Sequence, residues 1–293
     1  MNKKLNRKPI FSHLILTLYG LLCIVPFILI LSTSFSNEND VLEKGFSFLP
    51  QNFTTIAYKY VFKNAEAIFR AYGVTIIYAF GGAVLAILLM TGLGYSLSRE
   101  FFILRKPVSW ILIFTMFFNG GLIPNYIIRT QVYHLGNTIW VYLLDAAVTA
   151  YTVFVFRTFF SQVPKSLIEA AELDGASEFQ VLRHVMLPLS TAVLATYTFM
   201  QIVIRWNDFG VTMYYIQDTN LYSLQYMLQQ ILNELQYLNT LKQVMPSAVA
   251  GVELPSETLK YAMCIVISTP MFFVFPFFQK YFSKGMVVGS VKG

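Results

Sequence analysis

The residues best suited to a specific interaction gather in one polar stretch, residues 164–188, of a chain that is otherwise strongly apolar. Two pairs, Ser166 with Glu169 and Ser177 with Gln180, have the spacing of a capping box, in which a serine and an acidic or amide side chain cap the same helix start. The spacing therefore predicts two short helices in succession, outside any apolar run.

The junction between these helices carries a second signal. Asp174-Gly175 predicts the end of the first helix, because glycine readily adopts the left-handed backbone conformation required there. We expect the second helix to end near Pro188. Ala170 and Ala171 are small and leave a low surface on which another protein can sit. The stretch is thus predicted to be a helical hairpin that docks a partner.

The chain lacks the motifs of common catalytic sites. It contains no Gly-x-x-x-x-Gly-Lys-Ser/Thr phosphate loop, no His-Glu-x-x-His and no Gly-x-Ser-x-Gly. Cys23 and Cys264 lie in apolar runs, and we interpret them as buried hydrophobic residues rather than as a disulfide or metal pair. We expect no enzymatic activity, no cofactor and no metal in this chain, and any energy from ATP must come from a partner.

Composition favours a membrane protein. Of 293 residues, 56% are hydrophobic and 12% are charged, whereas soluble domains carry about 25% charged residues. The net charge of +6 is modest. Basic residues do not cluster with aromatic ones on a soluble face, so nucleic acid is not an expected partner.

Six stretches are long and apolar enough to be membrane helices, which need about 20 residues. They span residues 14–35, 73–97, 108–128, 138–156, 191–203 and 261–278. We predict an all-α protein with six transmembrane helices. Four glycines in the second stretch are expected to let a neighbouring helix approach closely: Gly81, Gly82, Gly92 and Gly94.

The distribution of lysine and arginine predicts the orientation. With a cytoplasmic N-terminus, about thirteen basic residues fall in the inside segments and about seven outside. Both termini and the hairpin are therefore predicted to be cytoplasmic. The predicted organisation is an N-terminal segment 1–13, a six-span domain 14–279 with outer loops 36–70 and 207–260, and a C-terminal tail 280–293.

The second outer loop contains an amphipathic pattern. Leucine and isoleucine recur at three- and four-residue spacing, opposite a face of uncharged polar residues. The apolar positions are Leu221, Leu224, Leu228, Ile231, Leu235 and Leu238. Two interpretations remain open: a helix that lies on the bundle or the membrane surface, and a docking element for an external partner.

Asp145 is the one acidic residue well inside a predicted span, and a charge there is costly unless it is paired or hydrated. It is either part of a substrate pathway or half of a structural pair with an arginine or polar group on another helix. Aromatic and amide groups near the membrane boundary suit sugar rings, but they also suit interfacial anchoring. The pathway candidates are Asn119, Asp145, Arg205, Trp206, Asn207 and Tyr215.

The motif from Glu169 to Pro188 reads Glu-Ala-Ala, three residues, Gly, nine residues, an aliphatic residue, one residue, Leu-Pro. It resembles the EAA loop of permease subunits of bacterial ATP-binding-cassette importers, with Val185 where that family more often has isoleucine. Residues 120–124, 206–208 and 285–293 are similar to the carbohydrate, maltose-type branch. The tail is similar to the sub-branch for complex or acidic oligosaccharides such as pectin or alginate fragments.

This resemblance implies a function. The EAA loop would seat in an ATPase dimer, which binds the ATP and magnesium. A second homologous permease subunit, an extracytoplasmic solute-binding protein and membrane lipid would be the other partners, and an oligosaccharide would cross by alternating access. The docking residues would be Glu169, Ala170, Ala171, Asp174, Gly175, Val185 and Pro188. The alternatives are an ion-coupled secondary transporter and a permease for a solute other than a sugar.

Overall fold

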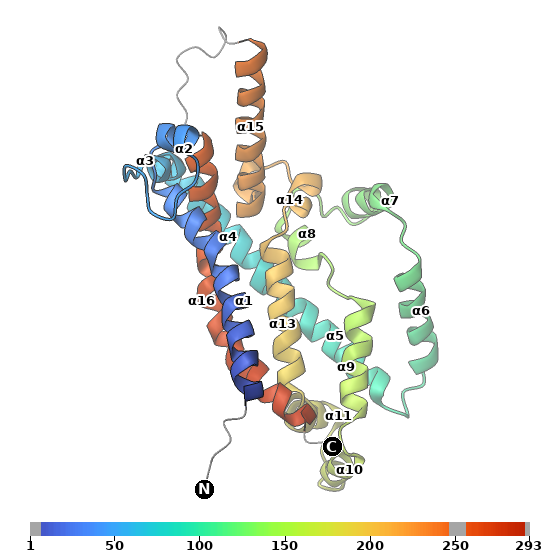
Figure 1. Ribbon diagram of the computed structural model, residues 1–293. Coiled ribbons are helices and arrows are strands. Elements are labelled where there is room, and N and C mark those ends of the chain that lie inside the picture. The colour runs from blue at the N-terminus through green and yellow to red at the C-terminus, as the bar shows by residue number, and fades with distance from the viewer. Residues whose placement is uncertain (1–6, 246–255, 291–293) are drawn as a thin grey trace, which may run out of the picture. The chain divides into compact units, whose positions relative to one another are not determined.

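The computed structural model describes residues 7–245 and 256–290. Within these ranges the chain is helical between its turns and contains no β-strand (Figure 1), which confirms the predicted all-α class. The chain divides into two compact units, Met1–Ile68 with Leu228–Thr269 and Phe69–Met227 with Pro270–Gly293.

The first unit begins with the apolar helix α1 (Arg7–Ser34). Its stretch Phe11–Ser34 has a mean hydropathy of 2.8 in its most apolar window, and no residue of that window is buried within the chain. An apolar helix segment with no buried residue suits contact with lipid or with another membrane helix. The predicted span 14–35 is therefore one continuous helix. Cys23 is exposed on it, so the prediction that both cysteines are buried is wrong for this residue.

The predicted outer loop 36–70 is folded rather than extended. It contains α2 (Glu38–Lys44), α3 (Ile56–Val61) and the short helix η1 (Phe62–Asn64). The Glu38 carboxylate accepts hydrogen bonds from the backbone N–H groups of Glu257 at 2.8 Å and Thr258 at 2.9 Å. It thereby caps α16 (Ser256–Ser290), where free N–H groups and the helix dipole favour a negative charge.

The predicted amphipathic helix is confirmed as α15 (Leu224–Val244). Leu224, Leu228 and Leu235 are buried, while Ile231 and Leu238 are half-buried. Leu221 lies outside it, in the preceding turn η5 (Thr219–Leu221). The three- and four-residue spacing therefore marked the buried face correctly.

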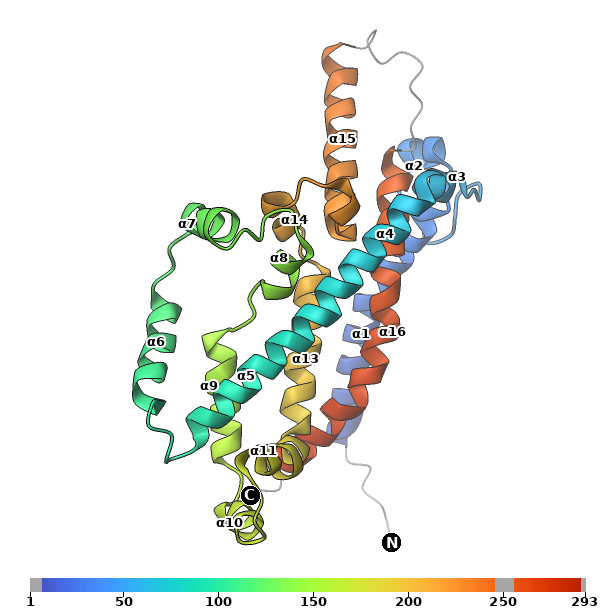
Figure 2. The same cartoon turned by 180° about the vertical axis from the view of Figure 1, so that it is seen from behind.

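Three helices form the centre of the second unit: α5 (Gly82–Ser98), α9 (Ala150–Ser161) and α13 (Thr191–Trp206). They lie side by side in Figures 1 and 2. α5 continues from α4 (Ala65–Ile76) through the π-helical turn η2 (Ile77–Gly81). The buried core between α5 and α9 includes Ala86, Met90, Leu97, Val153 and Phe156.

Glycines set the spacing of these helices. A Cβ atom at Gly94 would lie 2.8 Å from the Phe156 Cβ and 3.2 Å from backbone atoms of α9. A Cβ atom at Gly82 would lie 2.7 Å from the Arg205 Nε. A Cβ atom at Gly81 would lie 3.0 Å from the Leu143 Cδ2. A Cβ atom at Gly92 would have no other atom within 4 Å. Close approach is confirmed at three of the four predicted glycines and is wrong for Gly92.

Two predicted spans are broken by short connections. The region 108–128 forms α6 (Arg105–Phe117), α7 (Leu122–Ile127) and the start of η3 (Ile128–Val132). Gly121, with φ of +85°, interrupts the helical backbone there. The Gly121 N–H donates a hydrogen bond to the Asn119 Oδ1 at 2.9 Å.

The region 138–156 is likewise divided, into α8 (Ile139–Leu144) and α9, with Ala146 at φ of +45° between them. A single continuous helix across either of these two regions was the wrong prediction, because composition does not reveal the positive φ values at which the helices break.

Length and composition identify three described helices able to cross a membrane, within Phe11–Ser34, Ile56–Ser98 and Glu257–Tyr281. A fourth is reached only if Glu178–Leu189 and α13, which are bent by 83° at their junction, are counted together as one span. The number of spans, six, stays a prediction. The tail signature at residues 285–293 lies outside the residues whose side chains are described, as does part of the N-terminal segment 1–13.

We expect Gly94→Ala to destabilise the second unit by about 1–3 kcal/mol, the usual cost of overpacking, because the new methyl group meets α9 backbone atoms that cannot move aside. Gly92→Ala on the same helix is the matched control. It adds a methyl group in open space and is expected to leave the thermal unfolding midpoint unchanged or slightly higher. Equal midpoints for the two variants in detergent would contradict the packing described here.

Candidate functional site

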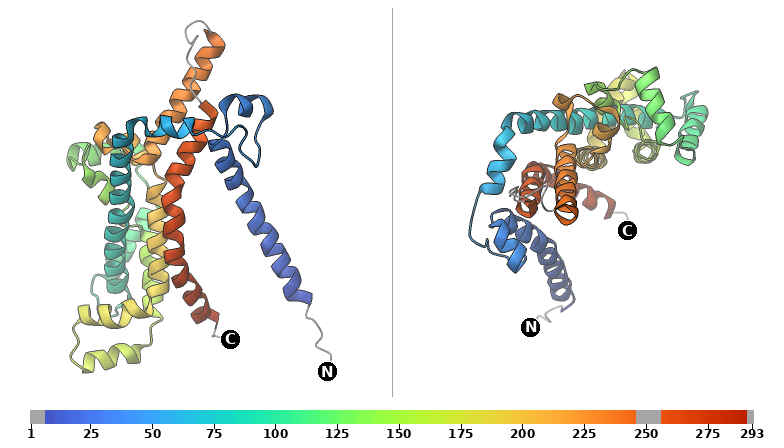
Figure 3. Two further views of the ribbon diagram at one scale, coloured as in Figure 1. Left: turned by 90° about the vertical axis from the view of Figure 1, so that its left-hand side faces the viewer. Right: turned by 90° about the horizontal axis from the view of Figure 1, so that it is seen from above.

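The polar stretch forms a hairpin between α9 and α13, at one end of these helices (Figure 3). Its first arm is α10 (Lys165–Leu173). The second arm runs through α11 (Glu178–Val181), the π-helical turn η4 (Leu182–Met186) and α12 (Leu187–Leu189). The predicted hairpin and its end near Pro188 are confirmed.

The turn between the arms depends on Gly175, whose φ is +81°. The Ala176 N–H donates to the Ala171 carbonyl at 2.9 Å, and the Gly175 N–H donates to the Glu172 carbonyl at 3.0 Å. This pair of bonds is the Schellman motif, which satisfies carbonyls at a helix end and requires the left-handed conformation that glycine adopts without strain. The predicted role of Asp174-Gly175 as a helix end is confirmed.

The two predicted capping boxes have different outcomes. In the second, the Gln180 side chain accepts a hydrogen bond from the Ser177 N–H at 2.7 Å, as predicted. The first is wrong, because α10 begins one residue before Ser166 and has no side-chain cap. The carbonyl of Pro164 instead accepts from the Leu167 N–H at 3.1 Å.

One face of the hairpin is packed against the helical core. Ile168, Val181 and Met186 are buried in the same cluster as Phe156 and Phe160 of α9. Burial of such side chains contributes about 1.5–3 kcal/mol each. The hairpin is therefore a fixed extension of the core rather than a loose loop.

The opposite face carries exposed apolar side chains. Leu173, at the end of α10, is 89% exposed, and Phe179, on α11, is 69% exposed. They flank the turn on its two sides. Glu169 is also exposed and makes no hydrogen bond or ion pair with the described residues. Exposed apolar groups beside an unpaired charge suit contact with another protein.

The remaining predicted docking residues divide between the two faces. Ala170, Asp174, Gly175 and Pro188 are exposed, whereas Ala171 and Val185 are half-buried and pack against the core cluster. The half-buried pair supports the hairpin from beneath, and the exposed residues remain accessible to a partner.

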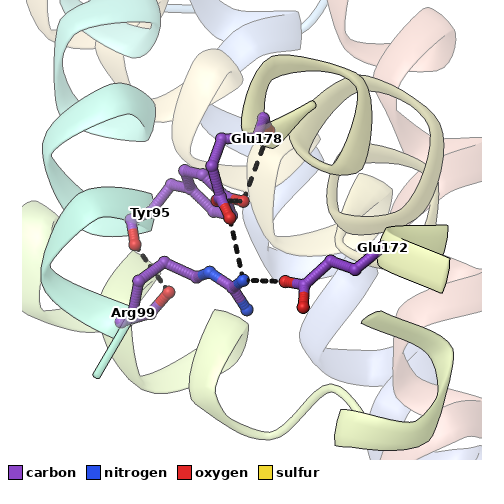
Figure 4. A network of polar contacts seen from close by, with 5 residues as sticks. Tyr95, Arg99, Glu172 and Glu178 are labelled. Carbon is purple, nitrogen blue, oxygen red and sulfur yellow. Dashed lines mark hydrogen bonds and ion pairs between the residues drawn. The ribbon is translucent and has the colours of Figure 1, made fainter. Parts of the chain in front are cut away.

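The end of α5 is joined to the hairpin by an ionic network (Figure 4). Arg99 Nη2 donates to the carboxylate of Glu172, and to that of Glu178 at 2.9 Å. The Tyr95 hydroxyl donates to the Glu178 carboxylate and lies 3.3 Å from the Glu178 carbonyl oxygen. The sequence analysis missed this network, since nothing local relates Arg99 to residues more than 70 positions later.

A second, more exposed ion pair lies nearby. The Lys165 Nζ donates to Glu100 at 2.7 Å, and both side chains are 74% exposed. This hydrogen bond, and then the charge of Lys165, hold the pKa of the Glu100 carboxyl below its usual range. A cavity of about 330 Å³ lies between the loop after α5 and the hairpin, with Arg99, Lys165 and Glu172 among its lining residues.

Asp145, which was predicted to lie within a membrane span, is paired with other side chains. Its carboxylate accepts from Arg129 at 2.6 Å and from the Tyr78 hydroxyl at 3.2 Å. The Arg129 guanidinium also lies over the ring of Tyr215, 5.1 Å from its centre. The structure therefore favours a structural pair, one of the two interpretations of Asp145.

Arg205 has partners other than a substrate carboxylate. It is 2% exposed and donates to the carbonyl oxygens of Asp145 at 2.8 Å and Ala146 at 3.2 Å. It also donates to the Gln201 side chain. These carbonyls are left free where α8 ends, so Arg205 closes the break between α8 and α9.

The other pathway candidates are dispersed. Trp206 and Tyr215 are buried, whereas Asn119 and Asn207 are exposed. Asp208, next to Asn207, accepts from the Val211 N–H at 2.9 Å at the start of α14 (Gly210–Tyr215), and burial raises the pKa of its carboxyl. The structure does not gather the candidates into one described cavity.

The class of protein follows from these features. Long apolar helices carry a rigid polar hairpin that exposes Leu173 and Phe179 beside its turn and Glu169 at the cavity next to the end of α5. No group of three His, Cys, Asp or Glu side chains gathers as metal ligands in the part of the chain that the structure describes. The chain is an integral membrane subunit whose hairpin has the form of a docking surface.

The family is shown by comparison with known proteins. The pattern of the family described as binding-protein-dependent transport system inner membrane component matches residues 101–288. The chain belongs to this family. It is a multi-pass component of the inner membrane, and its family is the non-catalytic permease component of ATP-binding-cassette transporters.

Individual relatives match nearly the whole chain. The polygalacturonan/rhamnogalacturonan transport system permease protein YtcP of Bacillus subtilis is 31% identical over 95% of this chain and 96% of that protein. Protein LplC of the same organism is 35% identical over 94% of this chain and 91% of that protein. A crystal structure of a bacterial ABC transporter involved in the import of the acidic polysaccharide alginate contains a chain with a TM-score of 0.79 and 27% identity, covering 96% of this chain and 99% of that one.

We expect Asp145→Asn to lower stability by about 1–3 kcal/mol, between the values for an exposed pair and for a broken buried one. The Arg129 and Asp145 side chains are only 26% and 20% exposed, so the substitution leaves a guanidinium without its countercharge. The measurement is the thermal unfolding midpoint in detergent. Glu100→Gln, which breaks an ion pair with both side chains 74% exposed, is the control and should change the midpoint much less.

Proposed function

We propose that this chain is the permease subunit of an ATP-driven importer of oligosaccharides, and that the hairpin 164–188 seats an ATPase subunit. The carrying observation is the exposed far face of the hairpin, with Leu173 and Phe179 on either side of the Gly175 turn. Two large, strongly exposed apolar side chains beside one turn, outside the long apolar helices, suit a surface that a partner protein covers. Glu169 adds an unpaired charge beside them.

The rigidity of the hairpin suits the transmission of movement. The arms are continuous with α9 on one side and with α13, through the 83° bend, on the other. Core packing at Ile168 and Val181 prevents the arms from moving independently of those helices. A partner that displaces the hairpin therefore displaces membrane helices as rigid bodies, as alternating access requires.

The proposed substrate is an acidic oligosaccharide. Support comes from two relatives whose names or descriptions concern polyuronides, the polygalacturonan/rhamnogalacturonan permease and the alginate importer. Arg205 is committed to backbone carbonyls and Arg129 to Asp145. We therefore assign recognition of the sugar to the assembled importer and to exposed polar groups such as Asn119 and Asn207.

The proposed assembly contains a second homologous permease subunit, an ATPase dimer that binds ATP and magnesium, and an extracytoplasmic solute-binding protein. The hairpin and both termini face the cytoplasm in this assembly, as the basic residues favour. Ion coupling loses its support, because Asp145, the acid that would carry it, is paired with Arg129.

Reconstituted vesicles test the energy source. We expect uptake of galacturonate or alginate oligosaccharides that requires the ATPase subunits, the solute-binding protein and internal ATP. Collapse of the proton and sodium gradients with ionophores is the control and should leave uptake unchanged. Uptake driven by an ion gradient in the absence of the ATPase would contradict the proposal.

The docking surface is tested by Leu173→Ser and Phe179→Ser. Each removes an exposed apolar side chain that the ATPase would bury, at a cost of about 1.5–3 kcal/mol, or roughly a tenfold or greater loss of affinity. The measurement is the dissociation constant of the ATPase from the purified permease pair. Leu49→Ser is the matched control, because Leu49 is 77% exposed but lies in the outer loop 36–70.

The same binding assay applies to Glu169→Lys and Gly175→Pro, which should also weaken the ATPase while the protein still inserts. Equal affinities for these variants, for Leu49→Ser and for the unaltered chain would exclude the hairpin as the seat of the ATPase.

A further inference from the structure

The hairpin is joined to the membrane helices in two different ways. Its arms are covalently continuous with α9 and α13. α5, the third helix of the central group, has no such continuity, because 66 residues separate its end at Ser98 from the start of α10 at Lys165. Any movement of the hairpin reaches α5 through non-covalent contacts, which are the core packing of α5 against α9 and α13 and the polar contacts at the end of α5.

Arg99 supplies the most direct of these contacts. It is the residue that follows α5, and one of its terminal nitrogens bonds both Glu172 and Glu178. Glu172 is at the end of α10 and Glu178 is at the start of α11, so a single guanidinium holds both arms on either side of the Gly175 turn (Figure 4). The Arg99 side chain is 14% exposed, which strengthens these interactions relative to pairs in open water.

The guanidinium is oriented by its neighbours. The rings of Tyr95 and Phe101 lie 6.0 Å and 5.0 Å from its central carbon, within the range of cation–π contacts. Tyr95 also donates to Glu178, so Tyr95 of α5 and Arg99, which directly follows α5, contact the same carboxylate. Arginine suits this position because its planar group presents several donors in fixed directions, which lysine does not.

The acidic residues of the hairpin divide between two tasks. Glu172 and Glu178 point to Arg99 and are occupied within the chain. Glu169, on the same helix as Glu172, is exposed and unpaired among the described residues. A substitution of Arg99 that removes the internal link leaves the exposed Leu173 and Phe179 unchanged, and it borders the cavity that Glu169 also lines.

We propose that Arg99 is a positioning residue that couples the hairpin to α5, so that a displacement of the hairpin moves α5 together with α9 and α13. This inference rests on the proposed function. Glu172, Glu178 and Tyr95 hold the guanidinium in place, and the link transmits the movement without contacting the ATPase or the substrate.

The test uses the complete importer in vesicles, with Arg99→Gln, Arg99→Lys and the double variant Glu172→Gln with Glu178→Gln. For Arg99→Gln we expect ATPase affinity within about twofold of the unaltered importer but uptake per ATP hydrolysed lower by about tenfold, within the usual range of coupling between sites. Arg99→Lys should restore part of the coupling, since it keeps the charge but not the fork. The double variant should reproduce Arg99→Gln with the arginine in place.

A distance measurement separates this role from general destabilisation. Spin labels at Leu88, an exposed residue of α5, and at His184, an exposed residue of the hairpin, are placed in a background with Cys23 and Cys264 replaced by serine. Their separation should stay constant during the ATP cycle of the unaltered importer. In Arg99→Gln it should change or broaden when ATP is added, because core packing alone then holds the end of α5 to the moving hairpin.

Three outcomes overturn the proposal: normal uptake per ATP in both Arg99→Gln and the double variant, an unchanged label separation in them, or loss of ATPase affinity in both. If Arg99→Gln does not accumulate in the membrane, the same uptake and distance measurements on the double variant test the proposal. Failure of the Arg99 proposal can be told apart from failure of the proposed function. ATP-driven uptake by the unaltered importer supports the proposed function even when the Arg99 variants remain coupled.

Discussion

The arrangement of the second unit depends on hydrogen bonds from the buried guanidinium of Arg205. It supplies donors to the carbonyl oxygens of Asp145 and Ala146, where the chain breaks between α8 and α9. In a lipid environment, backbone groups that leave a helix need partners within the protein. Gly82 leaves the room that the side chain requires. One residue of α13 thus contacts α5 and the end of α8, and the position of α9 follows from it.

The hairpin extends from that arrangement, and its two faces have opposite requirements. One face must be fixed to the helices, which the burial of Ile168, Val181 and Met186 achieves. The other must remain available, and there Leu173 and Phe179 are exposed. The second arm contains a π-helical turn, and an 83° bend separates it from α13. The hairpin that carries both faces is only about 25 residues long. Rigidity and accessibility are therefore combined in one element.

Much of the fold and of the hairpin was predictable, and the failures have local causes. Apolar runs of sufficient length correctly predicted α1, α13 and α16, and leucine spacing predicted α15. The predicted helices across residues 108–128 and 138–156 were wrong, since Gly121 and Ala146 take positive φ values that composition does not reveal. The capping box at Ser166 was wrong because the Pro164 carbonyl already begins the helix.

The sequence by itself determined the class of the protein. It is an all-helical membrane subunit with a polar hairpin, and the first arm of that hairpin ends at Gly175. These features are local, because helix periodicity, apolar length and the stereochemistry of glycine act over a few residues. Only the tertiary structure decided which charges pair. Arg99 meets Glu172 and Glu178 across more than 70 residues, and Arg205 meets carbonyls about 60 residues earlier. Such pairing depends on distances in space between side chains, and packing of the helices sets those distances.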